Sequence, residues 1–245
     1  MKVLTYIMKR LKKGRLHMTL LDPEKGTSHD IGKLAEMASN LGTDAIMVGG
    51  STGVDQKILD ANVREIKART SVPVILFPAD SSSLSPYADA IYFMSLLNSR
   101  SVTHVVREQR RASQAIKDMG LETIPMGYVI VDPGMKAGEV GEADLLRRDS
   151  SEGAVSYALT AEYFGMKLFY LEAGSGAPSP VPSDMIRAVK EESRLPLLVG
   201  GGIRSPEAAR EVAEAGADIV VTGTVVEREN GSKALKAVIH GVKGW

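Results

Sequence analysis

The 245-residue sequence contains no cysteine, which excludes disulfide bonds, thiolate nucleophiles and cysteine-ligated metal sites. Its four histidines show no i, i+4 pairing, so a zinc site is not expected either. Positive and negative charges are equal, with 30 Lys and Arg against 30 Asp and Glu, and this balance argues against a nucleic-acid-binding protein. No apolar run approaches the length of about 18 residues that a transmembrane helix needs.

The first 14 residues lack the long apolar core and the small-residue cleavage site of a signal peptide, and we expect a cytoplasmic protein. Apolar positions 4, 7, 8 and 11 are spaced as on one face of a helix and lie among five basic residues, which predicts an amphipathic helix at about residues 1–13. Such a helix either closes the bottom of a barrel or makes a transient contact with a membrane surface. We favour the first role, within a single domain spanning residues 1–245.

Short apolar runs alternate with amphipathic segments along most of the chain, a pattern typical of a parallel sheet with crossover helices. The expected strands are Leu16–Leu21, Ala45–Val48, Val74–Phe77, Ala90–Met94, Thr123–Val131, Leu168–Leu171, Leu197–Val199 and Ile219–Val221. The expected helices are Asp30–Leu41, Asp55–Arg69, Ser101–Met119, Glu152–Phe164, Ser183–Glu192, Pro206–Ala215 and Ser232–Val242.

Eight strands in this order predict an α/β fold closed into a (β/α)₈ TIM-type barrel. The alternative, a doubly wound open sheet, lacks its glycine fingerprint after the first strand. One link breaks the pattern, because residues 78–89 contain two prolines and four serines and leave little room for a helix. Either a short helix is hidden there, or the third outer helix is missing and leaves an apolar groove on the barrel wall.

Glycine-rich turns follow the last two expected strands. Gly200, Gly201 and Gly202 lead into Ser205 and Pro206, a good N-cap and first helical residue. The eighth strand leads into Thr222-Gly223-Thr224. Paired turns at these positions are how many barrels bind phosphate through backbone N–H groups. Tight turns without a ligand are the simpler interpretation of either turn alone, but the pair favours phosphate binding.

The sixth expected strand ends in a carboxylate that should lie inside the barrel. Alternation places Leu168, Tyr170 and Glu172 on one face, with Phe169 and Leu171 toward the helices. An unpaired carboxylate in the barrel mouth would be costly, so Glu172 either forms a structural salt bridge or orients and deprotonates a substrate hydroxyl. Its position directly before Gly-Ser-Gly favours the second role.

The first expected strand ends at Asp22, followed by Pro23. A carboxylate at the catalytic rim suits Mg²⁺, which prefers oxygen ligands and shares them with substrate phosphates. The second strand ends before Ser51, which would place its hydroxyl on the neighbouring rim. Asp22 and Ser51 therefore form a candidate Mg²⁺ site, although Asp22 would also suit a turn-capping role.

Taken together, these segments resemble the geranylgeranylglyceryl phosphate synthase family of archaeal lipid biosynthesis. The matching segments are residues 21–25 (LDPEK), 48–51 (VGGS), 92–98 (YFMSLLN), 170–176 (YLEAGSG), 199–204 (VGGGIR) and 222–224 (TGT). They span nearly the whole chain in order. Gly-Gly-Gly-Ile-Arg is shared by many phosphate-binding barrels, whereas residues 170–176 combined with residues 21–25 are far more specific.

The resemblance implies Mg²⁺-dependent transfer of a geranylgeranyl group from geranylgeranyl diphosphate to the 3-hydroxyl of sn-glycerol 1-phosphate. It implies Glu172 and Tyr170 as catalytic residues, Asp22 and Ser51 as metal ligands, and a barrel without a regular third outer helix. The implied glycerol phosphate site comprises Tyr170, Glu172, Ala173, Gly174, Ser175, Gly176, Gly201, Gly202, Gly223 and Thr224. Bacterial relatives use a longer prenyl diphosphate, so the motifs do not fix the chain length.

One departure concerns Leu20, where some family members carry a phosphate-binding lysine; Lys25 and Arg204 are candidates to replace its charge. The rival enzyme class is a phosphosugar isomerase or synthase barrel of amino-acid biosynthesis, with Asp22 and Asp132 as an acid–base pair. A barrel that only binds a phosphorylated ligand is a third option. We expect a homo-oligomer, and we expect the charged segment Lys136–Arg148 to be a solvated loop rather than a mobile lid.

Overall fold

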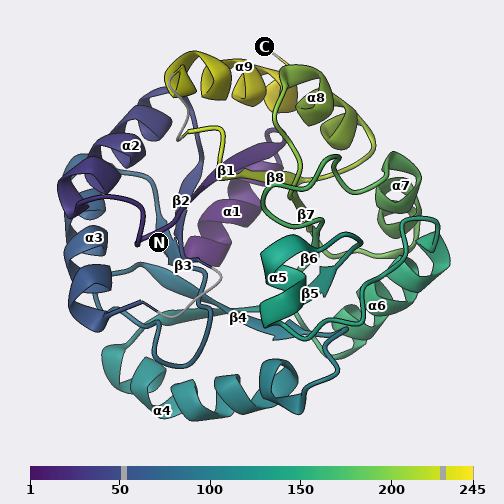
Figure 1. Ribbon diagram of the computed structural model, residues 1–245, viewed down its shortest axis with the longest axis horizontal. Coiled ribbons are helices and arrows are strands. Elements are labelled where there is room, and N and C mark those ends of the chain that lie inside the picture. Colours follow the sequence, from purple (N-terminus) through teal and green to yellow (C-terminus); the bar gives the residue numbers. More distant parts are fainter. Residues whose placement is uncertain (51–53, 227–229, 245) are drawn as a thin grey trace.

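The computed structural model describes residues 1–50, 54–226 and 230–244, and its eight parallel strands close into a barrel in chain order. A ring of helices surrounds this barrel (Figure 1). The predicted (β/α)₈ fold is therefore confirmed. The strands are β1 (Leu16–Leu21), β2 (Ala45–Val48), β3 (Val74–Leu76), β4 (Ala90–Leu96), β5 (Glu122–Ile130), β6 (Leu168–Glu172), β7 (Leu197–Gly200) and β8 (Ile219–Thr222).

The helices follow the expected pattern, with ends that differ by one or two residues. They are α1 (Val3–Leu11), α2 (Ser28–Asn40), α3 (Gln56–Arg69), η1 (Thr103–Arg107), α4 (Glu108–Met119), α5 (Met135–Val140), α6 (Ser151–Tyr163), α7 (Ser183–Glu192), α8 (Pro206–Glu214) and α9 (Gly231–Lys243). Residues 77–89 between β3 and β4 contain no helix. The missing third outer helix is thus confirmed, and the hidden short helix is not found.

Two expectations need correction. The single helix predicted over Ser101–Met119 begins with the wider π-helical turn η1. Two side chains bond to this turn: Ser95 Oγ donates to Val105 O at 2.7 Å and Gln109 Nε2 donates to His104 O at 3.2 Å. The segment Lys136–Arg148 is not simply a loop, because its beginning belongs to the short helix α5, which lies over one end of the barrel (Figure 1).

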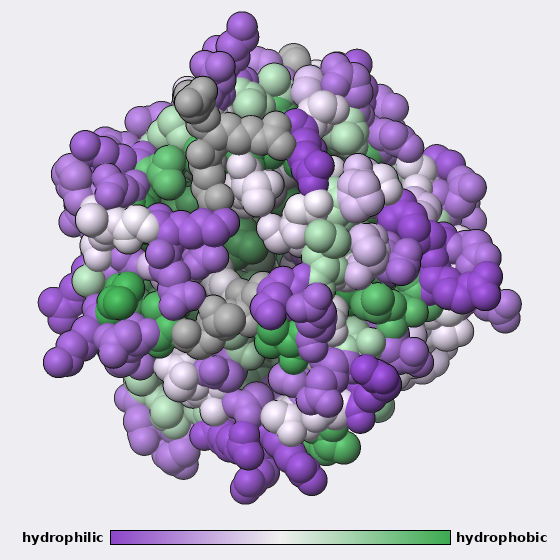
Figure 2. Space-filling view, in the orientation of Figure 1, coloured by the Kyte–Doolittle hydropathy of each residue, from purple (hydrophilic) through white to green (hydrophobic). Residues whose placement is uncertain are grey.

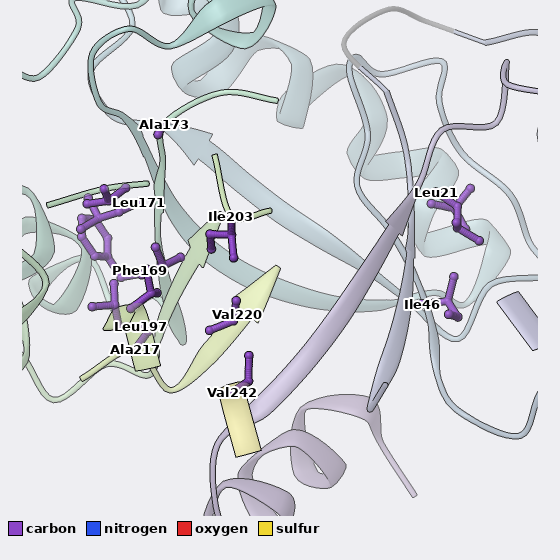
Figure 3. Packing of buried hydrophobic residues seen from close by; sticks show 14 of the residues in the cluster. Leu21, Ile46, Phe169, Leu171, Ala173, Leu197, Ile203, Ala217, Val220 and Val242 are labelled. Carbon is purple, nitrogen blue, oxygen red and sulfur yellow. The ribbon is translucent and has the colours of Figure 1, made fainter. Parts of the chain in front are cut away.

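Alternation along the strands separates an inner from an outer hydrophobic cluster. Leu168 and Tyr170 of β6 belong to the cluster inside the barrel, and Phe169 and Leu171 belong to the cluster between strands and helices, as predicted. Figure 3 shows part of the outer cluster, with Phe169 and Leu171 of β6 and Ala173 directly after that strand. No helix of the described residues is long and apolar enough to cross a membrane.

Helix α1 closes the amino-terminal end of the barrel. Val3 and Ile7 are buried in the inner cluster. The N–H groups of Val3 and Leu4 have no acceptor within the helix, and they donate to the Glu122 carboxylate at 2.5 and 3.0 Å. This contact stabilises the helix terminus. Arg10 pairs with the buried Asp44 at 2.5 Å. The helix therefore closes the bottom of the barrel, which is the role that we favoured from the sequence.

Replacing Ile7 with Ala should lower the free energy of unfolding by about 2–5 kcal/mol, because a fully buried side chain leaves a cavity at the barrel bottom. Met8, on the next position of the same helix, is 42% exposed and serves as the control: Met8→Ala should change stability by less than about 0.5 kcal/mol. Guanidinium unfolding of both variants measures this. Equal effects would show that α1 does not close the barrel.

Candidate functional site

A pocket opens at the end of the barrel where the strands have their carboxyl termini. Its lining includes Leu20, Asp22, Phe77, Tyr128 and Glu172, which come from four different strands or strand ends. Figure 2 shows this face, with hydrophobic side chains in a hollow near its centre and hydrophilic side chains around it. Catalytic groups of TIM barrels lie at this end, so the pocket is the candidate site.

Glu172 is the last residue of β6 and is 7% exposed. Tyr170 Oη donates to Glu172 Oε2 at 2.6 Å, and the Gly174 N–H donates to Oε1 at 2.7 Å. No Lys or Arg of the described residues pairs with this carboxylate, and burial raises the pKa of Glu172 above its ordinary value of 4.5. The structural salt bridge considered above is thus not formed by any described residue.

The raised pKa is what a general base needs. Two hydrogen bonds hold the carboxylate in one orientation, yet each oxygen retains capacity to accept a further hydrogen bond. Burial disfavours the charged form, so protonation of Glu172 is more favourable than protonation of a glutamate in water. The pKa of Tyr170 is raised well above 10.0, first by burial and then by the neighbouring Glu172 charge. Tyr170 therefore stays protonated and donates.

An aromatic cluster packs around Tyr170, and its members Phe77, Tyr92 and Tyr128 line the pocket. The ring centroids of Tyr128 and Tyr170 are 5.2 Å apart, and Phe77 lies 5.7 Å from Tyr128 and 5.9 Å from Tyr170. Phe77 also contacts Tyr92 edge-on at 6.3 Å. We did not predict roles for Phe77 and Tyr128. Alternation along the fifth strand would have placed Tyr128 inside the barrel, but the contact of both residues with Tyr170 depends on strand register.

Backbone hydrogen bonding brings the glycine turns to Glu172. Glu172 is registered with Gly200 on β7, and Gly200 with Val221 on β8. Gly201 and Gly202 have φ of +82° and +72°, a conformation that favours glycine. A Cβ atom on Gly201 would lie 2.4 Å from Glu172 Oε1. Gly201 therefore gives the carboxylate its space as well as forming the turn.

The same turns present backbone donors to the rim. The N–H groups of Gly201, Gly202, Gly223 and Thr224 donate to no acceptor within the described part of the chain. Backbone N–H groups of this kind bind phosphate oxygens. The two turns follow β7 and β8, which lie on one side of β6 in the barrel, so the predicted phosphate site lies next to the predicted base.

The other predicted binding residues divide into two groups. Ser175 and Gly176 are exposed at the rim beyond Glu172, and Ser175 lines the pocket. Ala173 does not face the pocket: its side chain packs in the outer cluster, its N–H donates to Gly200 O at 3.0 Å and its carbonyl accepts from the Gly134 N–H at 3.1 Å. Ala173 therefore connects β6 to its neighbours.

The two candidates for phosphate neutralisation are placed differently. Arg204 donates to the carbonyl oxygens of Gly176 and Ala177, at 2.8 Å for the second, so its guanidinium fastens the loop after β6 to the loop after β7. Lys25 lies exposed after Asp22. Arg204 brings positive charge close to the turn at Gly176 while also holding that turn in shape.

Asp22 lies in the pocket lining, where Mg²⁺ was predicted. Asp22 Oδ1 accepts from the Glu24 N–H at 3.1 Å, which is the turn-capping contact considered above. Oδ1 would also lie 3.1 Å from a Cβ atom on Gly50, so the carboxylate faces the end of β2. Ser51, the second predicted ligand, lies outside the described residues.

A ready-made metal centre is not part of the described chain, since no three His, Asp or Glu side chains converge there. One carboxylate at the rim nevertheless fits Mg²⁺, which is often held by one or two carboxylates together with substrate phosphates. Asp132, the acid–base partner required by the rival isomerase class, is exposed and does not line the pocket. The rival pair is therefore not assembled.

The pocket continues outward as an apolar groove past the place of the missing helix. Its walls include Leu84 from the helix-free link, Ile91 and Phe93 from β4, and Ala112 and Ile116 from α4. Ala137 and Val140 of α5 also line the pocket. The groove thus joins a polar site with a carboxylate at the barrel mouth to an elongated apolar surface, and it suits a ligand with one polar end and one long apolar end.

The comparisons with known proteins agree with this geometry. The model of the PcrB family matches residues 8–242. The geranylgeranylglyceryl phosphate synthase of Picrophilus torridus is 47% identical over 243 residues, which cover 99% of this chain and 100% of that protein. The enzyme of the same name from Thermococcus gammatolerans is 50% identical over 246 residues, covering 99% of this chain and 98% of that protein.

Solved structures give the same result. The crystal structure of (S)-3-O-geranylgeranylglyceryl phosphate synthase from Thermoplasma acidophilum, in complex with its substrate sn-glycerol-1-phosphate, is 48% identical with a TM-score of 0.97 and full coverage of both chains. A tryptophan synthase alpha chain from Legionella pneumophila is 15% identical with a TM-score of 0.64, covering 99% of this chain and 97% of that one. The latter likeness shows the barrel fold alone.

Replacing Gly201 with Ala should weaken binding of inorganic phosphate roughly tenfold or more, because the new Cβ atom pushes against Glu172 and the Gly174 backbone and displaces the backbone N–H groups that suit an anion. Gly165→Ala is the matched control, since Gly165 also has a positive φ (+77°) but nothing within 4 Å of an added Cβ. Both variants should lose about 1–3 kcal/mol of stability from backbone strain. Calorimetric titration measures the affinity of both variants. Equal affinities of the Gly201 and Gly165 variants would show that Gly201 is not part of the binding site.

Proposed function

This chain belongs to the PcrB family, and we propose that it transfers a geranylgeranyl group from geranylgeranyl diphosphate to the 3-hydroxyl of sn-glycerol 1-phosphate. The reaction releases diphosphate and forms an ether bond. This bond is the first ether bond made in archaeal membrane lipids. The observation that carries the proposal is the position of Glu172. This buried carboxylate, which no described cation neutralises, lies between backbone donors suited to a phosphate and an apolar groove suited to a prenyl chain.

Glycerol phosphate binds with its phosphate at the two glycine turns in this proposal. The N–H groups of Gly201, Gly202, Gly223 and Thr224 support this placement because they lie at the rim and no described acceptor uses them. Arg204 and the loop of Ser175 and Gly176 add a third wall. The glycerol hydroxyls then point toward Glu172, since β6 and β7 are adjacent.

The prenyl chain occupies the groove that passes between β4, α4 and the helix-free link. Apolar side chains line this path, and burial of a long hydrocarbon there would be favourable at roughly 25 cal/mol per Å² of apolar surface removed from water. The allylic carbon would lie near the mouth, where the rings of Phe77 and Tyr128, which line the pocket, can stabilise developing positive charge through their π faces. Orientation in this groove brings the carbon to the attacking hydroxyl.

Asp22 is the residue that we propose to hold Mg²⁺, with Ser51 as a second ligand beyond the described residues. When bound, the ion would neutralise the charge of the departing diphosphate and so improve it as a leaving group. Asp22 suits this role because its carboxylate lines the pocket and faces the end of β2 at Gly50. It follows β1, which pairs with β8, so the ion would lie beside the turn at Gly223.

Glu172 accepts the proton of the 3-hydroxyl as the new carbon–oxygen bond forms. The allylic carbon–oxygen bond to diphosphate breaks in the same event, so the hydroxyl supplies the electron pair and diphosphate leaves with the old one. Tyr170 donates to Glu172 throughout and fixes its orientation. A positioned base of this kind contributes typically 10²–10⁴-fold in rate.

The homo-oligomeric state and the cytoplasmic location expected from the sequence remain predictions, as does the length of the prenyl chain that is used. The direct test of the function is the release of diphosphate from geranylgeranyl diphosphate, measured with Mg²⁺ in the presence and absence of sn-glycerol 1-phosphate. We expect release only when the acceptor is present. Release that is independent of the acceptor, or no release with both substrates, would overturn the proposed activity.

The substitution Asp22→Asn distinguishes the proposed role of Asp22 in metal binding from its role in capping the turn. Asparagine keeps an oxygen to accept from the Glu24 N–H but loses the negative charge. We expect turnover to fall roughly 10²-fold or more, because the ion supplies several kcal/mol of charge stabilisation, while the melting temperature stays unchanged. Assays over a range of Mg²⁺ concentrations measure this. Normal turnover at limiting Mg²⁺ would remove Asp22 from the metal site.

Glu172→Gln tests the proposed base. The amide can accept from the Gly174 N–H and donate to Tyr170 Oη, so the shape and both contacts are kept. Turnover should fall roughly 10²-fold or more, while affinity for geranylgeranyl diphosphate barely changes.

The stability of the same variant depends on pH in a defined direction. Because burial raises the folded-state pKa of Glu172 above 4.5, the wild type loses stability relative to the glutamine variant as pH rises from about 4.5 through that raised pKa. At neutral pH the variant should therefore melt no lower than the wild type. Near-normal turnover with a lowered melting temperature would instead identify Glu172 as a structural residue.

A further inference from the structure

An exposed surface of mixed apolar and basic character runs along η1 and the start of α4. We call it the α4 strip and define it as Arg100, Val102, Val106, Arg107 and Arg110. Val102 and Val106 are 54% and 52% exposed, and the three arginines are exposed as well. Val102, Val106 and Arg110 follow each other at intervals of four residues, which places them on one side of the helix.

The strip is strongly positive in a chain whose total charge is zero. Residues 100–117 contain five basic side chains and one acidic one, Glu108, whereas the whole sequence has 30 of each sign. Glu108 is already engaged, because it pairs with Arg111 and accepts from the Ser81 N–H at 2.8 Å. Arg107 and Arg110 form no ion pair with any described residue. Their charge is therefore available to an outside partner.

The strip and the apolar groove share one helix. Gln109, Ala112 and Ile116 of α4 line the groove, while Val102, Val106 and Arg110 lie exposed. A partner that covers the strip would therefore lie at the edge of the groove. Under the proposed function, on which this step rests, the groove takes a long apolar chain that partitions into lipid.

We propose that the α4 strip docks the protein reversibly on an anionic lipid bilayer, so that the groove lies next to the membrane surface. The two valines would enter the headgroup region, as the apolar face of an interfacial helix does. The arginines would lie among lipid phosphates, to which clusters of basic residues are attracted. The prenyl substrate could then pass between bilayer and groove without crossing water.

A second copy of this chain fits the strip less well than a bilayer does, and a second basic surface lies elsewhere. A two-fold interface with a second copy brings the same patch of both subunits together, and it would place Arg107 and Arg110 against their own copies. The basic helix α1 offers a second surface at the other end of the barrel, but its residues Val3 and Ile7 are buried in the inner cluster. It lies far from the groove and therefore provides the control.

The experiment is binding to vesicles of phosphatidylcholine, with and without phosphatidylglycerol, measured by co-sedimentation. We expect the protein to bind only the anionic vesicles and to dissociate as salt increases. Arg107→Glu with Arg110→Glu should weaken this binding about tenfold or more, and Val102→Ser with Val106→Ser about threefold or more. Lys9→Glu on α1 with Lys13→Glu in the turn that follows it, which reverses as many charges, should leave binding unchanged.

Three results would overturn the proposal: no binding of the wild type to anionic vesicles, unchanged binding of both strip variants, or an equal loss in the α1 control. A change of oligomeric state in the strip variants without vesicles would assign the strip to a second copy. Melting temperatures establish that each variant is folded, and the two strip variants test charge and apolar contact independently.

Turnover distinguishes failure of docking from failure of the proposed function. With a short, water-soluble prenyl diphosphate and no vesicles, both strip variants should match the wild type, since none of the strip residues lines the pocket. With geranylgeranyl diphosphate supplied in anionic vesicles, their rates should fall in proportion to vesicle binding. Vesicle binding through the strip without any transfer activity would retain the docking surface and reject the proposed function.

Discussion

The site depends on a buried carboxylate that no positive charge of the described residues neutralises. Placing Glu172 inside the barrel carries a desolvation penalty, and two donors, Tyr170 Oη and the Gly174 N–H, offset only part of it. Such a group is poorly explained as a stabilising element, since replacement of buried ionic groups by uncharged ones is often neutral or stabilising. Its tendency to take up a proton is what a base acting on a hydroxyl requires.

Two features of the surrounding barrel fit this account: space for the buried carboxylate and a groove that suits a long apolar ligand. Gly200 and Gly201 leave room for the Tyr170 hydroxyl and the Glu172 carboxylate, because a Cβ atom on either would lie within 3 Å of them. On the other side, residues 77–89 cross from β3 to β4 without a helix, and the space next to α4 becomes the groove. One end of the ligand site is therefore polar and rigid, while the other is apolar and extended.

Much of the fold could be predicted from the sequence because strand and helix periods are local. The strands at Leu16–Leu21 and Ala45–Val48 and the inward direction of Tyr170 and Glu172 followed from alternation. The proline and serine content of residues 78–89 left a hidden short helix and a missing helix both open, and the family resemblance implied the second. Features that depend on distant contacts could not be predicted. The π-helical turn η1 is bonded by Ser95 of β4, and the short helix α5 contains Gly138 and is too short to show a helical period.

The same division holds within the site. The glycine turns and Glu172 could be found from residue order, whereas the aromatic cluster of Phe77 and Tyr128 needed the register of several strands. The lack of a described cation partner for Glu172 depends on every residue packed around it, and these residues come from distant parts of the sequence. The most direct test is the rate of ether-bond formation in a single turnover with both substrates bound, measured against pH. We predict a rate that falls on the acid side with a midpoint above 4.5, the ordinary pKa of a glutamate, and a rate that stays constant down to pH 4.5 would contradict the role of Glu172 as the base.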